Sequence, residues 1–577
     1  MWRALLKDEE QGPQAGEVEA LARRHPFSVY LPYRAYFEDR GEYLNVDNTY
    51  GRLWECRPLA FAGPKALESL AGLLRQEHPP GTTISLTLFP DDHIDALLAE
   101  YLALKTRGGE VSQAGARHYA EHLRAGRQGL ARMGGIPVRN FRLFVAIKSA
   151  ESFRDERVKS IEEALSQAGL APTPCPPGIL LDVLRRVFNG EAPRNATTYD
   201  SNRYLSNQII GAETVVRHDG DRLRLGSRYA ACLSPKSLST NGYIDSLEVN
   251  RLIGGFGGPQ EDGLQLGCPF LWTTTVFFQT QPADIRRKAA IMMAQRVGGT
   301  IAKAIGRRVQ ELTQDLEDLE KDRFVDVITS MWVFGEQEED LNRAVARARS
   351  LWEAQRFVMQ RETKIAPAML IQALPFGLYA TRTNIEILDR HFTLTAMAAA
   401  HLLPSQADFA GRMRPVQLYV GRKGQLASID VFDRSANNHN FLVCAGSGAG
   451  KSFMTNKLVA DYYATGALIR LIDIGYSYEK QALLSKGRYI DVGGEAGRLC
   501  LNPFTSSVQP DRLASEDRQG DELTVTMILL SMAFSATQVP ATEETLYSLM
   551  KDAVRFARAR DGGLRGVDHV EEYLRTY

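Results

Sequence analysis

A glycine-rich segment that ends in Lys451 and Ser452 constrains the fold of this chain more than any other feature. Residues 445–452 read Ala-Gly-Ser-Gly-Ala-Gly-Lys-Ser, which matches the pattern G-x-x-x-x-G-K-[ST] except that Ala445 stands at the first position. Glycines let the backbone curl around phosphate oxygens with its N–H groups pointing inward, and the positive end of a following helix adds to the attraction. The segment therefore predicts the strand–loop–helix unit of a P-loop nucleotide-binding domain.

Each polar residue of this motif has an expected role. Lys451 is expected to reach the β- and γ-phosphates, and it is the candidate catalytic residue. The Ser452 hydroxyl is expected to bind a metal ion, so the expected cofactors are ATP and Mg²⁺. The residues expected to contact the nucleotide are Ala445, Gly446, Ser447, Gly448, Ala449, Gly450, Lys451, Ser452 and Phe453.

The sequence on either side of the motif favours a parallel sheet. Residues 441–444 and 467–472 are short apolar runs, and both are predicted to be buried parallel strands. The helix between them is predicted to end at Gly466. A dinucleotide-binding GxGxxG fingerprint is excluded, because its third glycine would fall at position 451, which is lysine.

The acidic residue that P-loop hydrolases also need is not evident. Asp473 ends the run 467–472, but this strand directly follows the P-loop helix, so an aspartate that caps the next helix is the simpler interpretation. Residues 452–577 contain no four apolar residues followed by Asp-Glu. Because phosphoryl transfer also needs a group that orients water and usually an arginine finger, this chain is expected to lack the residues for turnover.

Composition and charge argue against several other classes. The 69 Lys and Arg residues equal the 69 Asp and Glu residues, so there is no basic excess for bulk nucleic-acid binding. No apolar run reaches the roughly 18 residues of a membrane span, and residues 1–12 lack the pattern of a secretory signal. The scattered cysteines predict a reduced, cytosolic protein. His118 and His122 do not form the His-Glu-x-x-His zinc motif and are interpreted as a solvated helix face.

The chain before residue 411 predicts mixed helices and strands. The strand–helix–strand order of 325–374 repeats that of 83–147, which suggests internal structural repetition. The predicted strands are 42–46, 52–56, 83–89, 141–147, 212–217, 222–233, 270–278, 325–334 and 369–374, and the predicted helices are 64–76, 92–106, 111–132, 178–188, 283–321 and 338–355.

Blocks of sequence in a set order resemble the TraC ATPases of F-type conjugation, within the VirB-class ATPases of type IV secretion systems. The P-loop alone is shared by many families, so the order and spacing of the blocks is the specific evidence. The resemblance covers most of the chain. Its blocks are Leu31-Pro-Tyr-Arg-Ala-Tyr36, Leu44-Asn-Val-Asp47, Gly51-Arg-Leu-Trp-Glu55, Pro58-Leu59, Leu374-Pro-Phe376, Asp430 to Asp433, Asn440, the P-loop, Asp473-Ile-Gly-Tyr-Ser-Tyr478 and Asn502-Pro-Phe504.

The resemblance implies an α/β chain in which N-terminal α+β domains precede an incomplete RecA-like P-loop NTPase domain. With the patterns above, it predicts an N-terminal α+β domain at 1–205, a middle α+β region with a long helical segment at 206–410, and a partial RecA-like domain at 411–577. Family members continue through a Walker B strand, a sensor and an arginine finger. The chain is therefore expected to be truncated at its C-terminus.

The resemblance also implies an ATPase subunit of a conjugative type IV secretion system, which powers pilus assembly and the transfer of DNA or protein. It implies a homo-hexamer that is cytoplasmic and attaches peripherally to the cytoplasmic face of the bacterial inner membrane. The implied partners are inner-membrane and other type IV secretion components, with DNA or a relaxase as a further candidate substrate.

Two alternative functions stay open. The chain could be a DNA-translocating P-loop motor, for which DNA-stimulated ATPase activity would be evidence. It could also be a scaffold that binds nucleotide without hydrolysing it. Hexamers that bind inner-membrane secretion proteins without DNA stimulation would favour the secretion ATPase.

Overall fold

The computed structural model describes most of the chain. The chain forms two compact units, 1–485 and 486–577, and each is described by itself. The predicted helix 283–321 lies outside the described residues. The described residues are 26–107, 109–131, 134–190, 198–238, 244–255, 265–278, 322–411, 414–434, 437–491, 502–504, 515–534, 544–559 and 566–577.

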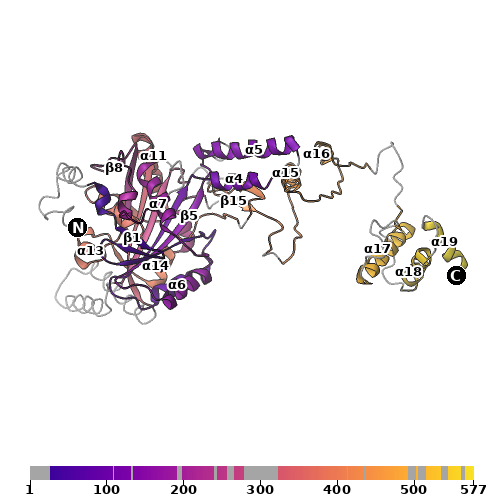
Figure 1. Cartoon of the computed structure of the whole chain (residues 1–577), viewed down its shortest axis with the longest axis horizontal. Helices are drawn as coiled ribbons and strands as arrows, with labels where there is room; N and C mark the ends of the chain where they lie inside the picture. Colours follow the sequence, from indigo (N-terminus) through magenta and orange to yellow (C-terminus); the bar gives the residue numbers. More distant parts are fainter. Residues whose placement is uncertain are drawn as a thin grey trace, which may run out of the picture. The chain divides into compact units, whose positions relative to one another are not determined.

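A 13-stranded antiparallel sheet forms the centre of the first unit (Figure 1). The strands are β1 (Tyr33–Phe37), β2 (Glu42–Asn45), β3 (Tyr50–Cys56), β4 (Thr83–Asp91), β5 (Asn140–Ser149), β6 (Thr173–Pro174), β7 (Val216–Asp219), β8 (Arg222–Leu225), β9 (Arg228–Ser237), β10 (Phe270–Phe277), β11 (Phe324–Gly335), β12 (Val358–Arg361) and β13 (Phe392–Thr395). The main order is β1-β2-β3-β5-β4-β10-β11-β9-β8-β7, while β6, β12 and β13 pair with β3, β9 and β11.

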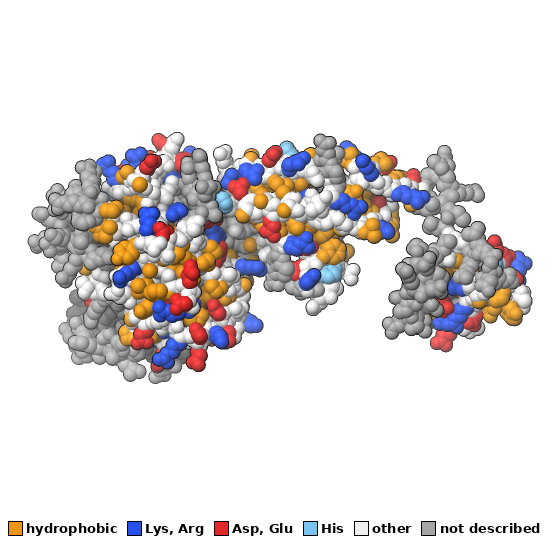
Figure 2. Space-filling view, viewed as in Figure 1, with side chains coloured by type: hydrophobic (Ala, Val, Ile, Leu, Met, Phe, Trp, Pro, Cys, Tyr) orange, Lys and Arg blue, Asp and Glu red, His pale blue; other side chains and the backbone are white. Residues whose placement is uncertain are grey.

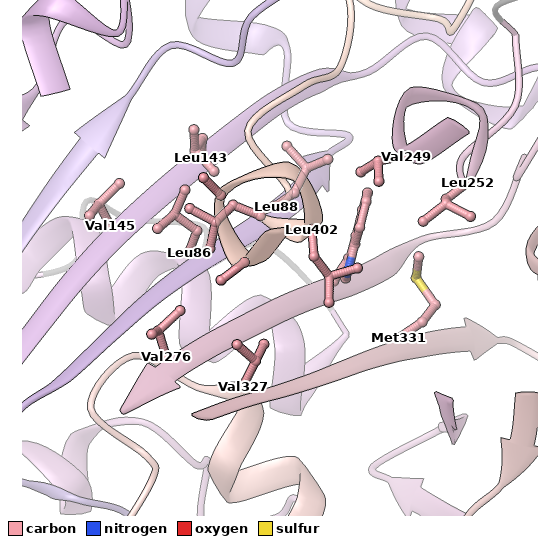
Figure 3. Packing of buried hydrophobic residues seen from close by; sticks show 14 of the residues in the cluster. Leu86, Leu88, Leu143, Val145, Val249, Leu252, Val276, Val327, Met331 and Leu402 are labelled. Carbon is pink, nitrogen blue, oxygen red and sulfur yellow. The ribbon is translucent and has the colours of Figure 1, made fainter. Parts of the chain in front are cut away.

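Helices cover both faces of this sheet, which is why β4 is buried along its whole length. Figure 3 shows one of the two cores, where Leu88 of β4, Leu143 of β5 and Val276 of β10 face Leu402. The helices that pack in this core are α3 (Pro64–Arg75), α6 (Asp155–Gln167), α8 (Ser246–Arg251), α11 (Glu338–Ala354) and α14 (Ala396–Leu402), and those of the opposite core are α7 (Pro177–Asn189), α12 (Ala366–Ala373) and α13 (Arg382–Leu388).

The sheet consists of two copies of one strand arrangement. The order β1-β2-β3-β5-β4 recurs as β7-β8-β9-β11-β10, and β6 pairs with β3 as β12 pairs with β9. Helices α3, α6 and α7 of the first copy correspond in chain order and core to α8, α11 and α12. The two copies meet where β4 pairs antiparallel with β10. The structure thus shows internal repetition, but 83–147 corresponds to 270–335 and not to 325–374.

Several sequence expectations for this unit are confirmed. The hairpin of β2 and β3, the helix α3 and the strands β4, β5, β10 and β11 form within a few residues of the predicted ranges. Other expectations are wrong. The predicted strand 212–217 is strand only at 216–217, where β7 begins. The predicted strand 222–233 is divided into β8 and β9 by a turn at Gly226, and 369–373 of the predicted strand 369–374 lies in helix α12. All residues of α12 are buried, so apolar side chains occur on every face. The sequence therefore lacks the alternation of apolar and polar residues that would distinguish a helix from a strand.

A helical arm extends from the sheet between β4 and β5. Helices α4 (Asp95–Ala103) and α5 (Gly109–Ala125) lie alongside each other (Figure 1) and pack against the hairpin of β14 (Gln417–Val420) and β15 (Leu426–Ile429). Their shared core contains Leu98, Leu123 and Leu418. This arm reaches the segment that contains the P-loop.

The second unit consists of three described helices, α17 (Ser515–Phe534), α18 (Glu544–Ala559) and α19 (Val567–Thr576), around a small apolar core. In the first unit, the predicted boundary at 205/206 falls between the two copies of the strand arrangement, and both copies share one sheet. The three-domain division stays a prediction. Among the described helices, none has the length and apolar character needed to cross a membrane.

Candidate functional site

The P-loop lies directly before helix α15 (Lys451–Ala464), as the motif predicts. Gly448 and Gly450 have φ angles of 76° and 91°, in the left-handed region that favours glycine. A Cβ atom added at either position would meet no atom within 4 Å. The backbone conformation therefore favours glycine at both positions, and the space beside them is open.

The N-terminus of α15 is suited to an anion. The N-cap residue Gly450 has no side chain to cap the helix, and the backbone N–H of Met454 donates to the Gly450 carbonyl at 3.0 Å. The N–H groups of the first turn therefore have no acceptor within the helix, and they point towards the loop. Lys451 and Ser452 are both exposed beside them. Positive charge, free donors and a hydroxyl are placed together where phosphates would bind.

The two strands predicted beside the loop, 441–444 and 467–472, do not form in the structure. Neither 441–444 nor 467–472 pairs with another strand among the described residues, and Leu442 and Ile472 are exposed by 87% and 101%. An apolar run becomes a strand only where a neighbouring strand completes its hydrogen-bond ladder. The described sheets contain no strand in that position. The apolar run alone was therefore insufficient evidence.

Asp473 lies in a loop that contacts the first half of α15. Its carboxylate accepts a hydrogen bond from the backbone N–H of Tyr478 at 3.3 Å, and Tyr478 is the N-cap residue of α16 (Glu479–Leu484). The Tyr478 hydroxyl lies 2.6 Å from the Thr455 hydroxyl of α15. This geometry fits the interpretation of Asp473 as a residue that supports the start of the next helix.

The described residues contain no group of three or more His, Cys, Asp or Glu side chains that could hold a metal ion. A P-loop does not need such a group. Mg²⁺ in these sites retains several waters and is bound by one or two protein oxygens and the substrate phosphates. The exposed Ser452 hydroxyl at the start of α15 fits this requirement.

The far end of α15 meets residues that the sequence analysis did not identify. The Asp461 carboxylate accepts a hydrogen bond from the Tyr101 hydroxyl at 2.8 Å and pairs with Lys105 Nζ at 3.1 Å. Its second oxygen pairs with Lys457 Nζ at 2.5 Å. Lys457 also lies over the Tyr119 ring, 4.4 Å from its centroid. We call Tyr101, Lys105, Tyr119, Lys457 and Asp461 the helix-anchoring cluster.

Burial determines the electrostatics of this cluster. The side chains of Lys105 and Asp461 are exposed by only 2% and 8%. Burial lowers the pKa of Lys105, while the nearby Asp461 carboxylate opposes that change. Burial and the same carboxylate raise the pKa of Tyr119 to about 12. No sequence signal could have joined these residues, because Tyr101 and Asp461 are 360 positions apart.

Comparisons with known proteins give matches to both parts of the chain. A family model described as TraC protein matches residues 27–378, and a TraG P-loop domain model matches residues 418–544. The protein TraC of Escherichia coli strain K12 is 23% identical, and the alignment covers 99% of this chain and 67% of that protein. The first match spans both copies of the strand arrangement, and the second includes the P-loop and α15.

Proposed function

Because the chain belongs to the TraC family of conjugative type IV secretion ATPases, we propose that residues 445–452 bind Mg·ATP. The observation that supports this proposal is the loop before α15, with left-handed glycines at 448 and 450 and open space in front of it. Backbone N–H groups would bind the phosphates there. In this arrangement Lys451 would bind the β- and γ-phosphates, and Ser452 would bind Mg²⁺.

The test is the affinity of the 577-residue chain for a non-hydrolysable Mg·ATP analogue, measured by calorimetry. Lys451→Ala removes the cation next to the phosphates, so we expect affinity to fall by about 10- to 100-fold, the value of one charge-assisted hydrogen bond. Its melting temperature should stay close to wild type, since exposed substitutions usually cost within about 0.5 kcal/mol.

The control variant is Lys480→Ala, which removes another exposed lysine, from α16. It should bind the analogue like the wild type. Equal affinity in the Lys451→Ala variant and the wild type would refute the assignment of this loop.

We propose that the chain acts with other type IV secretion components at the cytoplasmic face of the inner membrane, as a homo-hexamer that supports pilus assembly. Its described surface fits contacts with mixed charges, because acidic and basic side chains are interspersed on the face shown in Figure 2. DNA or a relaxase is the proposed cargo of the assembled system.

Membrane attachment is proposed to be peripheral, because no described helix can cross a bilayer. In fractionated cells, we expect high salt or alkaline carbonate to release the chain from membranes, since charged contacts between exposed groups are screened by salt. A transmembrane protein of the same cells provides the control. Retention of the chain with the bilayer after both washes would contradict peripheral attachment.

A further inference from the structure

Helix α15 is held at one end and exposed at the other. Its buried residues are Val459, Asp461, Tyr462 and Ala464, all in the second half of the helix. Its first three residues, 451–453, are exposed. A helix of 14 residues is about 20 Å long, so the P-loop and the anchored end lie at opposite ends of one rigid element.

The anchored end is held chiefly by the arm. Three polar groups of the helix-anchoring cluster meet at Asp461, and Lys105 Nζ also donates to the Val416 carbonyl at 2.6 Å. The backbone N–H of Arg107 donates to the Ala464 carbonyl at 2.8 Å. The Arg107 guanidinium donates to the Ala467 carbonyl at 3.1 Å, just beyond the helix. The arm thus binds both the side chains and the last carbonyls of α15.

The arm in turn continues into the centre of the sheet. Helix α4 follows β4, and α5 leads to β5 through the segment that contains Val138. Strands β4 and β5 pair along their whole length, and β4 also pairs with β10 of the second copy. A displacement of α15 would therefore act on the arm and on the two central strands from which the arm extends.

We propose that the helix-anchoring cluster couples nucleotide binding at the P-loop to the arm, with Asp461 as the positioning residue. This inference rests on the proposed binding of Mg·ATP at 445–452. Nucleotide that binds the N-terminus of α15 restricts the helix, and the cluster transmits that restriction to α4 and α5. By linkage, a change in the arm changes nucleotide affinity by the same factor.

The experiment is amide hydrogen exchange of the full chain with and without a non-hydrolysable Mg·ATP analogue at saturating concentration. In the wild type, we expect the analogue to slow exchange in 95–103 and 109–125 by at least about fivefold, the low end of typical coupling between sites. Lys451→Ala should abolish both binding and the response of the arm. Asp461→Asn should retain binding, with altered affinity, and lose the response of the arm.

Two further variants separate coupling from loss of structure. Removing one partner of a buried ion pair can destabilise the fold, so the pair Lys105→Met with Asp461→Leu replaces both charges with apolar groups of similar size. It should fold and lose the response. Asp430→Asn changes a different contact of the same helix, in which the Tyr462 hydroxyl donates to Asp430 at 2.8 Å. This control should retain the response.

The outcomes distinguish the inference from the proposed function. If the wild type binds the analogue and the arm does not respond, the coupling is refuted and the nucleotide site stands. If variants of Asp461 bind the analogue and still respond, the role of the cluster is refuted. If the wild type does not bind, or Lys451→Ala binds equally well, both proposals are refuted.

Discussion

Lys423 is a buried cation in the turn between β14 and β15, and only 3% of its surface is exposed. Its Nζ donates to the side chain of Asn250 and to the Asn250 carbonyl. Burial is the main cause that lowers its pKa from 10.5 to about 7, with Asp408 opposing and Arg139 adding to the change. At neutral pH the folded chain therefore carries this side chain only partly charged.

The lowered pKa predicts a pH dependence of stability. Between about pH 7 and 10.5 the unfolded chain binds a proton that the folded chain lacks, so the free energy of unfolding rises with pH in this window. The slope from one group can reach about 1.4 kcal/mol per pH unit. Lys423→Met should remove this contribution, measured as the difference from wild type in urea unfolding at pH 7, 8 and 9.

Arg422→Met is the control for this measurement, because Arg422 is the neighbouring cation and is exposed. Its difference from wild type should be constant over the same range. A Lys423→Met variant whose difference from wild type is also constant would contradict a lowered pKa at this position.

At the scale of elements, Gly51 of β3 lies against the ring of Phe376. A Cβ at Gly51 would be 2.6 Å from Phe376 Cε1, and this ring also packs on Tyr33 and Tyr43. Tyr33, Gly51 and Phe376 belong to blocks that carried the family resemblance at both ends of the matched range. The contact explains in physical terms why a glycine and a phenylalanine occur in these blocks.

Gly51→Ala should therefore destabilise the chain by about 1–3 kcal/mol, the usual cost of overpacking a core. A second change, Phe376→Leu, should recover part of the loss by making room. Gly72→Ala in α3 is the control, because a Cβ there meets nothing within 4 Å. Urea unfolding provides the measurement, and equal stability of the Gly51→Ala variant and the wild type would show that Phe376 moves away freely.

At the scale of the whole molecule, the two copies of the strand arrangement are joined by β4 and β10. The pairing runs from Trp272 opposite Leu88 to Phe277 opposite Thr83. Separation of the copies would expose two buried central strands as sheet edges, which favours aggregation. The copies therefore differ from independent domains, even though the predicted boundary at 205/206 lies between them.

This arrangement predicts the behaviour of the two fragments 1–205 and 206–410. Fragment 1–205 alone should aggregate or unfold without cooperativity, because β4 would lose its partner β10. Co-expression of both fragments should give a stable complex. Size-exclusion chromatography and thermal unfolding would measure both outcomes. A monomeric fragment 1–205 with a cooperative transition would show that the first copy is an independent domain.

Local sequence was sufficient for elements whose signals lie within a few residues. The hairpin of β2 and β3 follows from alternation with a turn between the strands, and α15 follows from the glycines before Lys451 and from Gly466 at its end. The expected nucleotide site, residues 445–453, was predicted from this motif and the segments beside it for the same reason. Positive φ angles and helix ends are properties of a short stretch of backbone.

Tertiary structure decided what depends on distant partners. The runs 441–444 and 467–472 have the apolar pattern of strands, but no described strand pairs with them, whereas most of the equally apolar run 369–374 lies in helix α12. The contact between Tyr101 and Asp461 and the pairing of β4 with β10 join residues that are far apart in the sequence. The sequence by itself indicated the glycine-rich loop and most elements, because local backbone preferences specify them, and the order of its sequence blocks indicated the family. Long-range packing decided which strands pair and which helix ends come into contact. Such contacts leave no signal in the local sequence.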